Sequence, residues 1–162
     1  MERSLFEDDD LPGEAAPARP LRLPLDCPDA AILTAARRWT ERLVAQDYVG
    51  AWEMLQHRPG EVWAPTPDRL RARLVNYGSP DPIPGEPTCV VTPIESAAGE
   101  PWRTLPRLTR APAGQPHRPP NYRGRLDWPL PLNGRWSDLV ASFDLVDDGG
   151  ELAFLLAGLR VP

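Results

Sequence analysis

The sequence predicts an α+β domain in which N-terminal helices pack on a bent antiparallel β-sheet. Between residues 28 and 78, apolar residues recur at helical spacing, which is typical of amphipathic helices. From residue 126 onward, apolar and polar residues alternate instead, as they do in strands with one buried face. The dipeptide Asn133-Gly134 lies between two alternating segments and indicates a tight hairpin. Helices followed by strands favour an α+β over an α/β architecture.

The first helix is expected to begin near Pro28, because proline suits the first helical position. Ile32, Ala36, Trp39 and Leu43 follow at spacings of 4, 3 and 4 residues and form one apolar stripe. We therefore expect this helix to bury Trp39 against the sheet.

Two shorter helices are expected to follow the first. Asp47 is a suitable N-cap for the second, in which residues 48–55 place their apolar side chains on one face. The triplet Thr66-Pro67-Asp68 is a strong start signal for the third. Gly78 and Pro80 are expected to end it.

Four strands are predicted in the second half of the chain, at residues 88–95, 126–132, 135–146 and 151–161. The alternation within residues 135–146 changes phase near Ser137-Asp138, which predicts a β-bulge at that point. Pro129 and Pro131 lack backbone N–H groups, so their strand is expected to lie at a sheet edge there. Residues 151–161 are almost entirely apolar, as in a strand buried on both faces.

The chain is expected to form a flexible arm at residues 1–25 and a single domain at residues 26–162. The arm is acidic and then rich in proline and alanine, a composition that buries too little apolar surface to fold alone. Residues 96–121 are rich in proline and arginine and are predicted to form a long irregular loop.

Composition excludes several classes of function. The net charge of −5 argues against a nucleic-acid partner. No apolar stretch approaches the roughly 20 residues of a membrane span, so no membrane partner is expected. All 18 strongly basic residues are arginine, which excludes a Schiff-base lysine and a Walker-A phosphate loop.

The cysteines and histidines do not indicate a metal site or a cofactor. Cys27 and Cys89 lie far apart, and His57 and His117 are not at ligand spacing. We expect two reduced thiols, no metal, no cofactor and a cytoplasmic location, since the acidic N-terminal residues do not form a secretory signal.

At residues 46–52, directly after the first helix, the chain resembles the nuclear-transport-factor-2-like superfamily. These domains are also called cystatin-like or cone-shaped α+β barrels. The third short helix and the long bent meander extend the likeness over residues 28–161, and residues 132–139 look like a turn segment of uncharacterised bacterial members. The resemblance implies a cone with one open end. Its members include isomerases, dehydratases, hydrolases, cyclases, transport adaptors and immunity or accessory proteins, so the fold does not fix the function.

The resemblance also implies candidate catalytic groups. Enzymes of this superfamily often use an aspartate as general base and a tyrosine or aspartate as hydrogen-bond donor. The loose equivalents are Tyr48, Tyr77, Asp127 and Asp144. The alternation pattern, however, places Asp127 and Asp144 on the face opposite to the apolar side chains, where we expect them to be solvated. Tyr48 is expected to pack its ring in the helical core.

A basic segment is the strongest candidate for a binding surface. Residues 101–126 carry six arginines and no acidic residue, while residues 1–31 carry eight acidic residues and three arginines. The candidate binding residues are Arg103, Arg107, Arg110, Arg118, Tyr122, Arg123 and Arg125. We hypothesise that they receive the acidic residues 7–10 of the arm or an acidic partner protein. A solvated loop with ordinary arginines is the alternative.

The leading functional hypothesis is a non-enzymatic domain of the accessory or immunity kind that binds another protein. The alternative is a small-molecule isomerase or dehydratase that uses the cone cavity, and a second alternative is a homodimeric scaffold. A cone filled by Trp39, Trp52, Phe143 and Phe154 would favour binding, whereas a deep pocket with inward-facing Asp and Tyr side chains would favour an enzyme.

Overall fold

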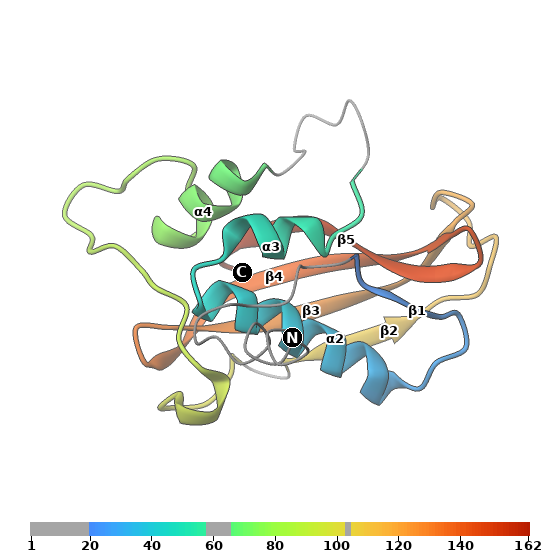
Figure 1. The fold of residues 1–162 in the computed structure, drawn as a ribbon, viewed down its shortest axis with the longest axis horizontal. Helices are drawn as coiled ribbons and strands as arrows, with labels where there is room; N and C mark the ends of the chain where they lie inside the picture. The colour runs from blue at the N-terminus through green and yellow to red at the C-terminus, as the bar shows by residue number, and fades with distance from the viewer. Residues whose placement is uncertain (1–19, 58–65, 103–104) are drawn as a thin grey trace, which may run out of the picture.

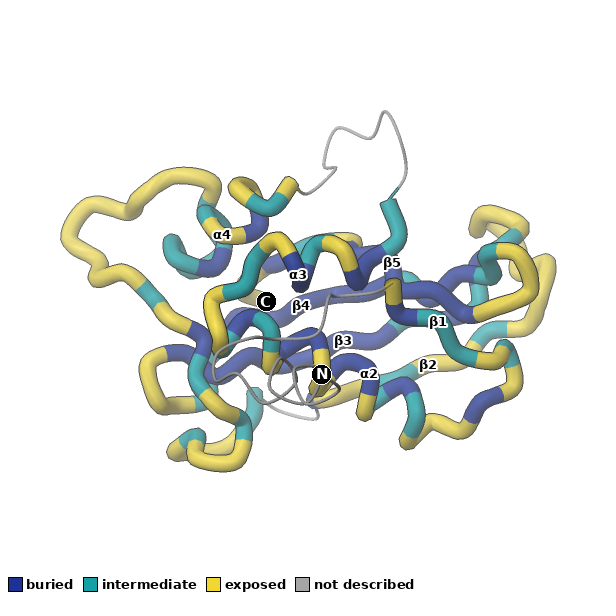
Figure 2. Tube along the Cα trace, viewed as in Figure 1, coloured by how far each residue is buried: buried dark blue, intermediate teal, exposed yellow. Residues whose placement is uncertain are grey.

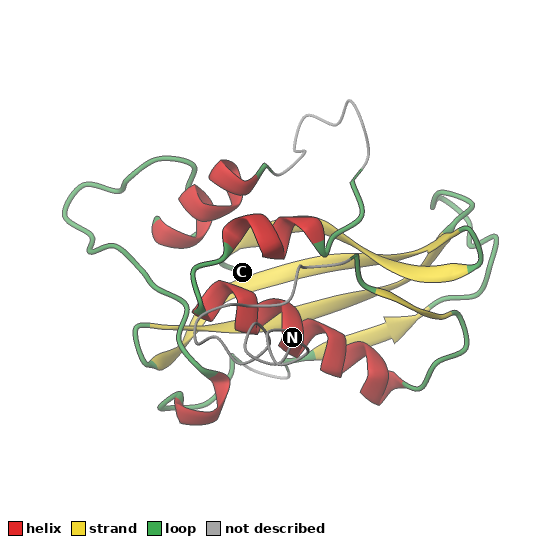
Figure 3. Cartoon of the chain, viewed as in Figure 1, coloured by secondary structure: helices red, strands yellow, loops and turns green. Residues whose placement is uncertain are grey.

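The computed structural model describes residues 20–57, 66–102 and 105–162, and in them three helices lie against a strongly curled five-stranded antiparallel sheet. The strand order is β1-β5-β4-β3-β2, so the short strands β1 (Arg22–Pro24) and β2 (Arg107–Arg110) form the two edges. Figure 3 shows the helices on one side of the sheet. This half-barrel confirms the predicted α+β class and its cone-like arrangement.

The three helices follow the local signals in the sequence. Helix α2 (Asp29–Val44) begins directly after Pro28, and the predicted stripe from Ile32 to Leu43 is buried. Helix α3 (Tyr48–Glu53) is capped by Asp47, whose carboxylate accepts a bond of 2.9 Å from the Gly50 N–H. Helix α4 (Pro67–Val75) is capped by Thr66, which accepts from the Arg69 N–H at 3.1 Å.

Three long strands make the body of the sheet, namely β3 (Tyr122–Leu132), β4 (Arg135–Asp148) and β5 (Glu151–Arg160). Asn133 and Gly134 connect β3 to β4 with φ of 53° and 85°, the left-handed backbone that a two-residue hairpin turn requires. Residues Leu152 to Leu156 of β5 are all buried. The predicted hairpin and the predicted two-sided burial of this strand are both confirmed.

A bulge in β4 bends the sheet at the predicted place. Pro129 pairs with Val140 and Pro131 pairs with Trp136, so β4 has extra residues between these pairs. The Ser137 hydroxyl occupies the gap, donating to the Leu130 carbonyl at 2.6 Å and accepting from the Leu139 N–H at 3.1 Å. Because β2 pairs with β3 only as far as residue 127, β3 is locally an edge at Pro129, whereas the carbonyl of Pro131 accepts from the Thr92 N–H at 3.1 Å.

The strand predicted at residues 88–95 is wrong. This segment instead makes one bridge, Val91 to Leu132, and a short 3-10 turn η1 (Ile94–Ser96). Its backbone is held by the end of the β3–β4 hairpin: the Val90 N–H donates to Asn133 Oδ1 at 3.0 Å, and the Asn133 N–H donates to the Val90 carbonyl at 2.9 Å. A side chain thus takes the place of a neighbouring strand, and Pro93 interrupts any longer ladder.

The two edge strands lie in segments for which no strand was predicted. Residues 22–24, assigned to the arm, form β1 and pair with β5. Residues 107–110, assigned to the irregular loop at 96–121, form β2 and pair with β3. The acidic residues 1–19 lie outside the described residues. Strands of three or four residues carry too short a pattern for recognition without their partners.

The centre of the fold is filled by aromatic and aliphatic side chains between α2 and the sheet. Trp39, Phe143 and Phe154 are each 0% exposed, and Trp39 meets Phe143 edge-on with ring centroids 4.9 Å apart. The Trp128 indole donates to Thr40 Oγ1 at 2.8 Å, which connects β3 to α2. Figure 2 shows the long strands as the most buried part of the trace.

Candidate functional site

The four candidate catalytic residues lie on different parts of the structure. Phe143 and Leu126 face the filled core, so their neighbours Asp144 and Asp127, of opposite parity, lie on the outer face of the sheet. Tyr48 begins α3 and packs partly against the core. Tyr77 follows α4 and lines a surface pocket. A shared catalytic role for these four residues remains a prediction with no common site to support it.

Asp127 lies on the expected face, but the expectation that it is solvated is wrong. It is 7% exposed, because basic and polar side chains of three strands converge on it. Its Oδ1 accepts from Arg125 Nε at 3.0 Å and from the Ser142 hydroxyl at 2.9 Å, and its Oδ2 lies 3.4 Å from Arg107 Nη2. Alternation identifies the face of a strand, but it does not show what covers that face.

These contacts keep Asp127 ionised. Burial raises the pKa of its carboxyl, but hydrogen bonds from Arg125 and Ser142 and the charge of Arg125 outweigh burial, so the net pKa is below the ordinary value. A general base needs a pKa near the working pH and access to substrate. The environment of Asp127 is that of a structural carboxylate.

Asp144 and Tyr48, two of the other three candidates, lie on the sheet and at the start of α3, respectively. Asp144 is half-buried and pairs with Arg125 across the β3–β4 ladder; its predicted exposure is therefore only partial. Burial raises the pKa of Tyr48, while the charge of Arg71 opposes the shift. A tyrosine with a raised pKa stays neutral and serves as a hydrogen-bond donor or packing group.

We define the arginine surface as the predicted binding residues that the structure describes: Arg107, Arg110, Arg118, Tyr122, Arg123 and Arg125. Arg103 lies outside the described residues. Tyr122 is buried, and the Arg118 guanidinium lies 4.6 Å from the centroid of its ring. Arg123 donates to Asp147 at 3.2 Å and to the carbonyls of Pro120 and Tyr122. A contact within the chain is therefore present for each of these five arginines.

Arg110 makes three contacts, all with the segment that follows β1. It donates to the carbonyls of Cys27 and Leu25 and to Asp29 Oδ1, each at 3.0 Å. The segment that follows β1 at one sheet edge is thereby tied to β2 at the other edge. Arg110 thus closes one end of the half-barrel, and Figure 1 shows β1, β2 and the start of α2 together at that end.

A pocket lies between the end of α4 and the loop that follows it, close to the end of the β3–β4 hairpin. We call it the Tyr77 pocket. It has a volume of about 190 Å³ and is lined by Asn76, Tyr77, Pro82, Ile83, Glu86, Pro87, Thr88 and Cys89. Tyr77 and Cys89 also line a shallower hollow that extends to residues 132–138 of the β3–β4 hairpin. Of the candidate catalytic residues, only Tyr77 lines this pair of hollows.

Backbone geometry fixes the walls of the Tyr77 pocket. Tyr77 itself has a φ of 55° and Gly78 a φ of 90°, which turn the chain sharply after α4. The Cys89 N–H donates to the Val75 carbonyl at 2.9 Å and returns the loop to the end of α4. Between them, Ile83 to Glu86 form a tight turn closed by a bond of 3.0 Å from the Glu86 N–H to the Ile83 carbonyl.

The titratable groups of the pocket are the Tyr77 phenol, the Cys89 thiol and the Glu86 carboxylate. Burial raises the pKa of Tyr77, and the negative charges of Asp138 and Glu86 raise it further, against a hydrogen bond from the Asp138 backbone. Burial and the charge of Glu86 raise the pKa of Cys89. A thiol with a raised pKa is a weak nucleophile, so the pocket is equipped for binding and not for covalent catalysis.

The sequence signal for this pocket is the run of prolines at 80, 82, 84 and 87 beside Tyr77-Gly78. Gly78 and Pro80 on their own predict only the end of a helix. Proline runs mark loops, but they do not show that the loop folds back on the helix end.

Other kinds of site find no support in the described part of the chain. Residues 20–57, 66–102 and 105–162 contain no group of three or more His, Cys, Asp or Glu side chains placed to hold a metal ion. Cys27 and Cys89 are both free thiols. Within those same ranges, no helix has the length and apolar character needed to cross a membrane.

Comparison with models of known protein families found no match, and comparisons with curated proteins and with solved structures found none either.

Proposed function

We propose that this protein is a non-enzymatic domain that binds another protein, in the manner of accessory or immunity domains. The observation that carries the proposal is the filled cone. Trp39, Phe143 and Phe154 are 0% exposed at its centre, in the region where an isomerase or dehydratase of this architecture would hold its substrate. Of the four aromatic residues expected to fill the cone, only Trp52 is half-buried, and it stacks on His57 at 4.3 Å.

The placement of the acidic candidates supports the same proposal. Asp127 and Asp144 face away from the cone, and Asp127 is occupied by Arg125, Ser142 and Arg107. A cavity enzyme needs its general base inside the cavity. The enzyme alternative would therefore need catalytic groups other than those that the superfamily resemblance implies.

We place the binding surface at the Tyr77 pocket and the loop around it. Ile83 and Val90 are 38% and 39% exposed, and among the described residues they are two of four large apolar residues that are open to solvent. They lie on the loop that forms the pocket wall and on the segment that follows it. Apolar side chains beside a pocket are typical of protein interaction sites. The arginine surface is a weaker candidate for the binding surface, because its guanidinium groups already make contacts within the chain.

Several finer expectations belong to the same proposal. The element order and the curled sheet support membership of the nuclear-transport-factor-2-like superfamily. The arginine-only basic residues support a bacterial source with a GC-rich genome. The reduced cysteines support a cytoplasmic location, and the net charge of −5 supports a partner other than nucleic acid.

Site-directed photo-crosslinking in the cells that make the protein would test the proposal. A photoreactive amino acid at position 83 is expected to give a discrete adduct with one partner, and the same group at exposed Val49 on α3 (55% exposed) serves as the matched control. The purified partner should then bind wild-type protein at least tenfold more tightly than Ile83→Asp, with Val49→Asp unchanged. An adduct with a second copy of the chain would instead support the homodimeric scaffold. The absence of a discrete adduct at position 83 would contradict the proposed surface.

A further inference from the structure

The Tyr77 pocket has the size of one long side chain. Its volume of about 190 Å³ is below the roughly 300–1,000 Å³ typical of pockets for drug-sized ligands. It opens beside the exposed Ile83, on the surface proposed above for the partner. A side chain of the partner is therefore a better fit to the pocket than a free metabolite.

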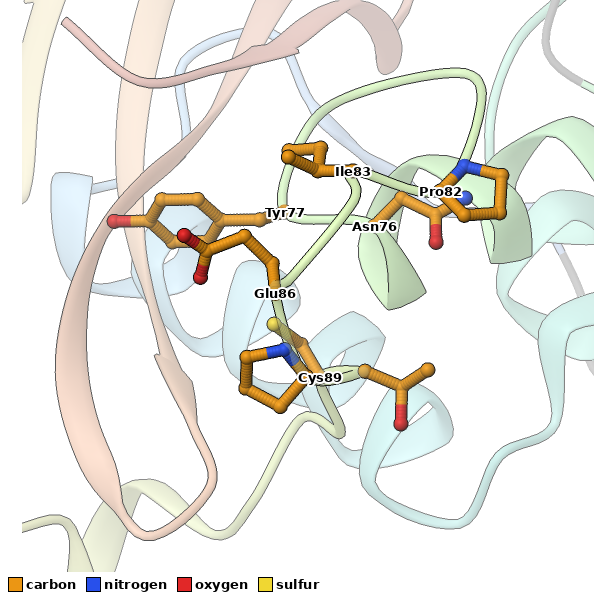
Figure 4. Close-up of a pocket in the computed structure, with 8 residues that line it drawn as sticks. Asn76, Tyr77, Pro82, Ile83, Glu86 and Cys89 are labelled. Atoms are coloured by element: carbon orange, nitrogen blue, oxygen red, sulfur yellow. The ribbon is translucent and has the colours of Figure 1, made fainter.

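The lining favours a side chain with an apolar stem and a positive end. Pro82, Ile83 and Pro87 supply apolar walls, and the Tyr77 ring supplies an aromatic one. Glu86 is the only charged residue in the lining. Among the described residues, no hydrogen bond or ion pair engages its carboxylate, which lies beside the Tyr77 ring in Figure 4.

The electrostatic field at the pocket also favours a cation. Glu86 acts on both Tyr77 and Cys89, and Asp138 acts on Tyr77 from the adjoining hollow. Asn76 and Thr88 add oxygen atoms that can accept hydrogen bonds. Arg135, which lines the adjoining hollow, is absent from the lining of the Tyr77 pocket itself.

We propose that the Tyr77 pocket takes up one arginine side chain from the partner protein, with the guanidinium between the Glu86 carboxylate and the Tyr77 ring. Arginine fits better than lysine, because its planar guanidinium stacks on an aromatic face and donates several hydrogen bonds in fixed directions. Its methylene stem packs on Pro82 and Ile83. This inference depends on the proposed function and names the chemistry by which the partner would be recognised.

The experiment uses acetyl-arginine amide as the probe and acetyl-citrulline amide as its neutral isostere, each titrated into full-length protein labelled for NMR. The arginine probe is expected to shift the amide signals of residues 76–89 with weak, saturable binding. The citrulline probe should bind at least threefold more weakly, the discrimination expected of one partly exposed charge pair. Glu86→Gln should abolish the difference between the probes. Glu151→Gln, which neutralises an exposed carboxylate at the start of β5, should preserve it.

Equal binding of the two probes, or no shift in residues 76–89, would overturn the inference. The two proposals fail separately. A crosslinked partner at position 83 with no preference for arginine would leave the binding function standing and remove the arginine site. A preference for arginine with no crosslinked partner would leave a cation-binding pocket and contradict the protein-binding function.

Discussion

The arginine surface and the Tyr77 pocket lie at opposite ends of the β3–β4 hairpin and use their charges in opposite ways. At the first, Arg123, Arg125 and Arg110 donate to acidic side chains and carbonyls of the same chain. At the second, Glu86 has no such partner among the described residues. A segment rich in arginine therefore stabilises the fold, while a loop with two acidic residues and no arginine keeps the Glu86 carboxylate available beside a pocket. A segment with many charged residues can form many polar contacts. Whether those contacts are made within the chain or with a partner depends on the fold.

The largest effect that tests this comparison is expected from Asp127→Asn. The change removes the buried negative charge that accepts bonds from Arg125 and Ser142, and it replaces one carboxylate oxygen with an amide NH2 group that cannot accept a hydrogen bond. It should lower the free energy of unfolding by about 3 kcal/mol, since the buried carboxylate loses the charge that strengthens its hydrogen bonds. Urea denaturation measures the loss. Asp138→Asn, at an exposed aspartate, is the matched control and should change stability by less than about 0.5 kcal/mol.

The stability of wild type and of Asp127→Asn, measured as a function of pH, tests whether the charge of Asp127 causes the difference between them. The folded pKa of Asp127 is lowered, so the stability that it contributes is present above its unfolded pKa and is lost as the pH falls through the folded value. The stability difference between wild type and Asp127→Asn should be constant above about pH 5 and should shrink below about pH 4. A difference that does not change with pH would show that the charge of Asp127 is unimportant.

Arg110→Ala is expected to have the next largest effect. The guanidinium holds the carbonyls of Leu25 and Cys27 and the Asp29 carboxylate, so its loss should cost about 2 kcal/mol. Hydrogen exchange should accelerate in residues 21–29 more than in β4. Arg118→Ala, which removes only the contact with the Tyr122 ring, is the control. Equal effects of the two substitutions would mean that Arg110 does not close the barrel.

Two glycine substitutions near the pocket should have smaller effects on stability. Comparing them separates the cost of backbone strain from the cost of a steric contact. Gly78→Ala should cost about 1–2 kcal/mol, because a Cβ at φ +90° is strained and would lie 3.1 Å from Leu139 Cδ1. Gly85→Ala has a similar φ of +83° with nothing within 4 Å, so only the backbone strain of about 1 kcal/mol applies. Thermal unfolding should rank the two variants in this order. The reverse order would contradict the described packing of α4's end on β4.

The smallest effect on stability is expected from Ile83→Asp. Ile83 is 38% exposed on the loop, so the free energy of unfolding should change by less than about 0.5 kcal/mol. Binding of the crosslinked partner should nevertheless fall at least tenfold. Arg110→Ala should do the opposite and reduce stability without acting at the pocket. The two variants together therefore separate the stabilising role of the arginine surface from the binding role of the Tyr77 pocket. Loss of binding in both variants to the same degree would indicate that stability alone is responsible.

Much of the architecture could be predicted because local signals and the tertiary fold agree. Asp47 and Thr66 cap helices where their side chains predict caps, and Asn133-Gly134 turns the hairpin where φ must be positive. The bulge at Ser137 also follows from a change of phase within one strand. In each case the local sequence is enough to predict the cap, the turn or the bulge.

The remaining features depend on partners that are distant in sequence. Strand β2 exists because β3 offers a ladder to residues 107–110. Residues 88–95 have strand-forming side chains, yet the hairpin end satisfies their backbone in another way. The burial of Asp127 comes from Arg107 and Ser142 on neighbouring strands. The Tyr77 pocket requires the loop to return to α4, which one-dimensional patterns do not encode.

The attachment of residues 88–98 to the hairpin end has a consequence for assembly on the ribosome. Val90 and Asn133 are 43 residues apart, and Ala98 bonds to Gly134 and Trp136. While the chain emerges from its N-terminus, this stretch has no template until the hairpin has left the exit tunnel. A stalled chain that ends before residue 133 would therefore expose Val91, which is buried in the folded protein, and such nascent chains should be the ones that chaperones and proteases capture.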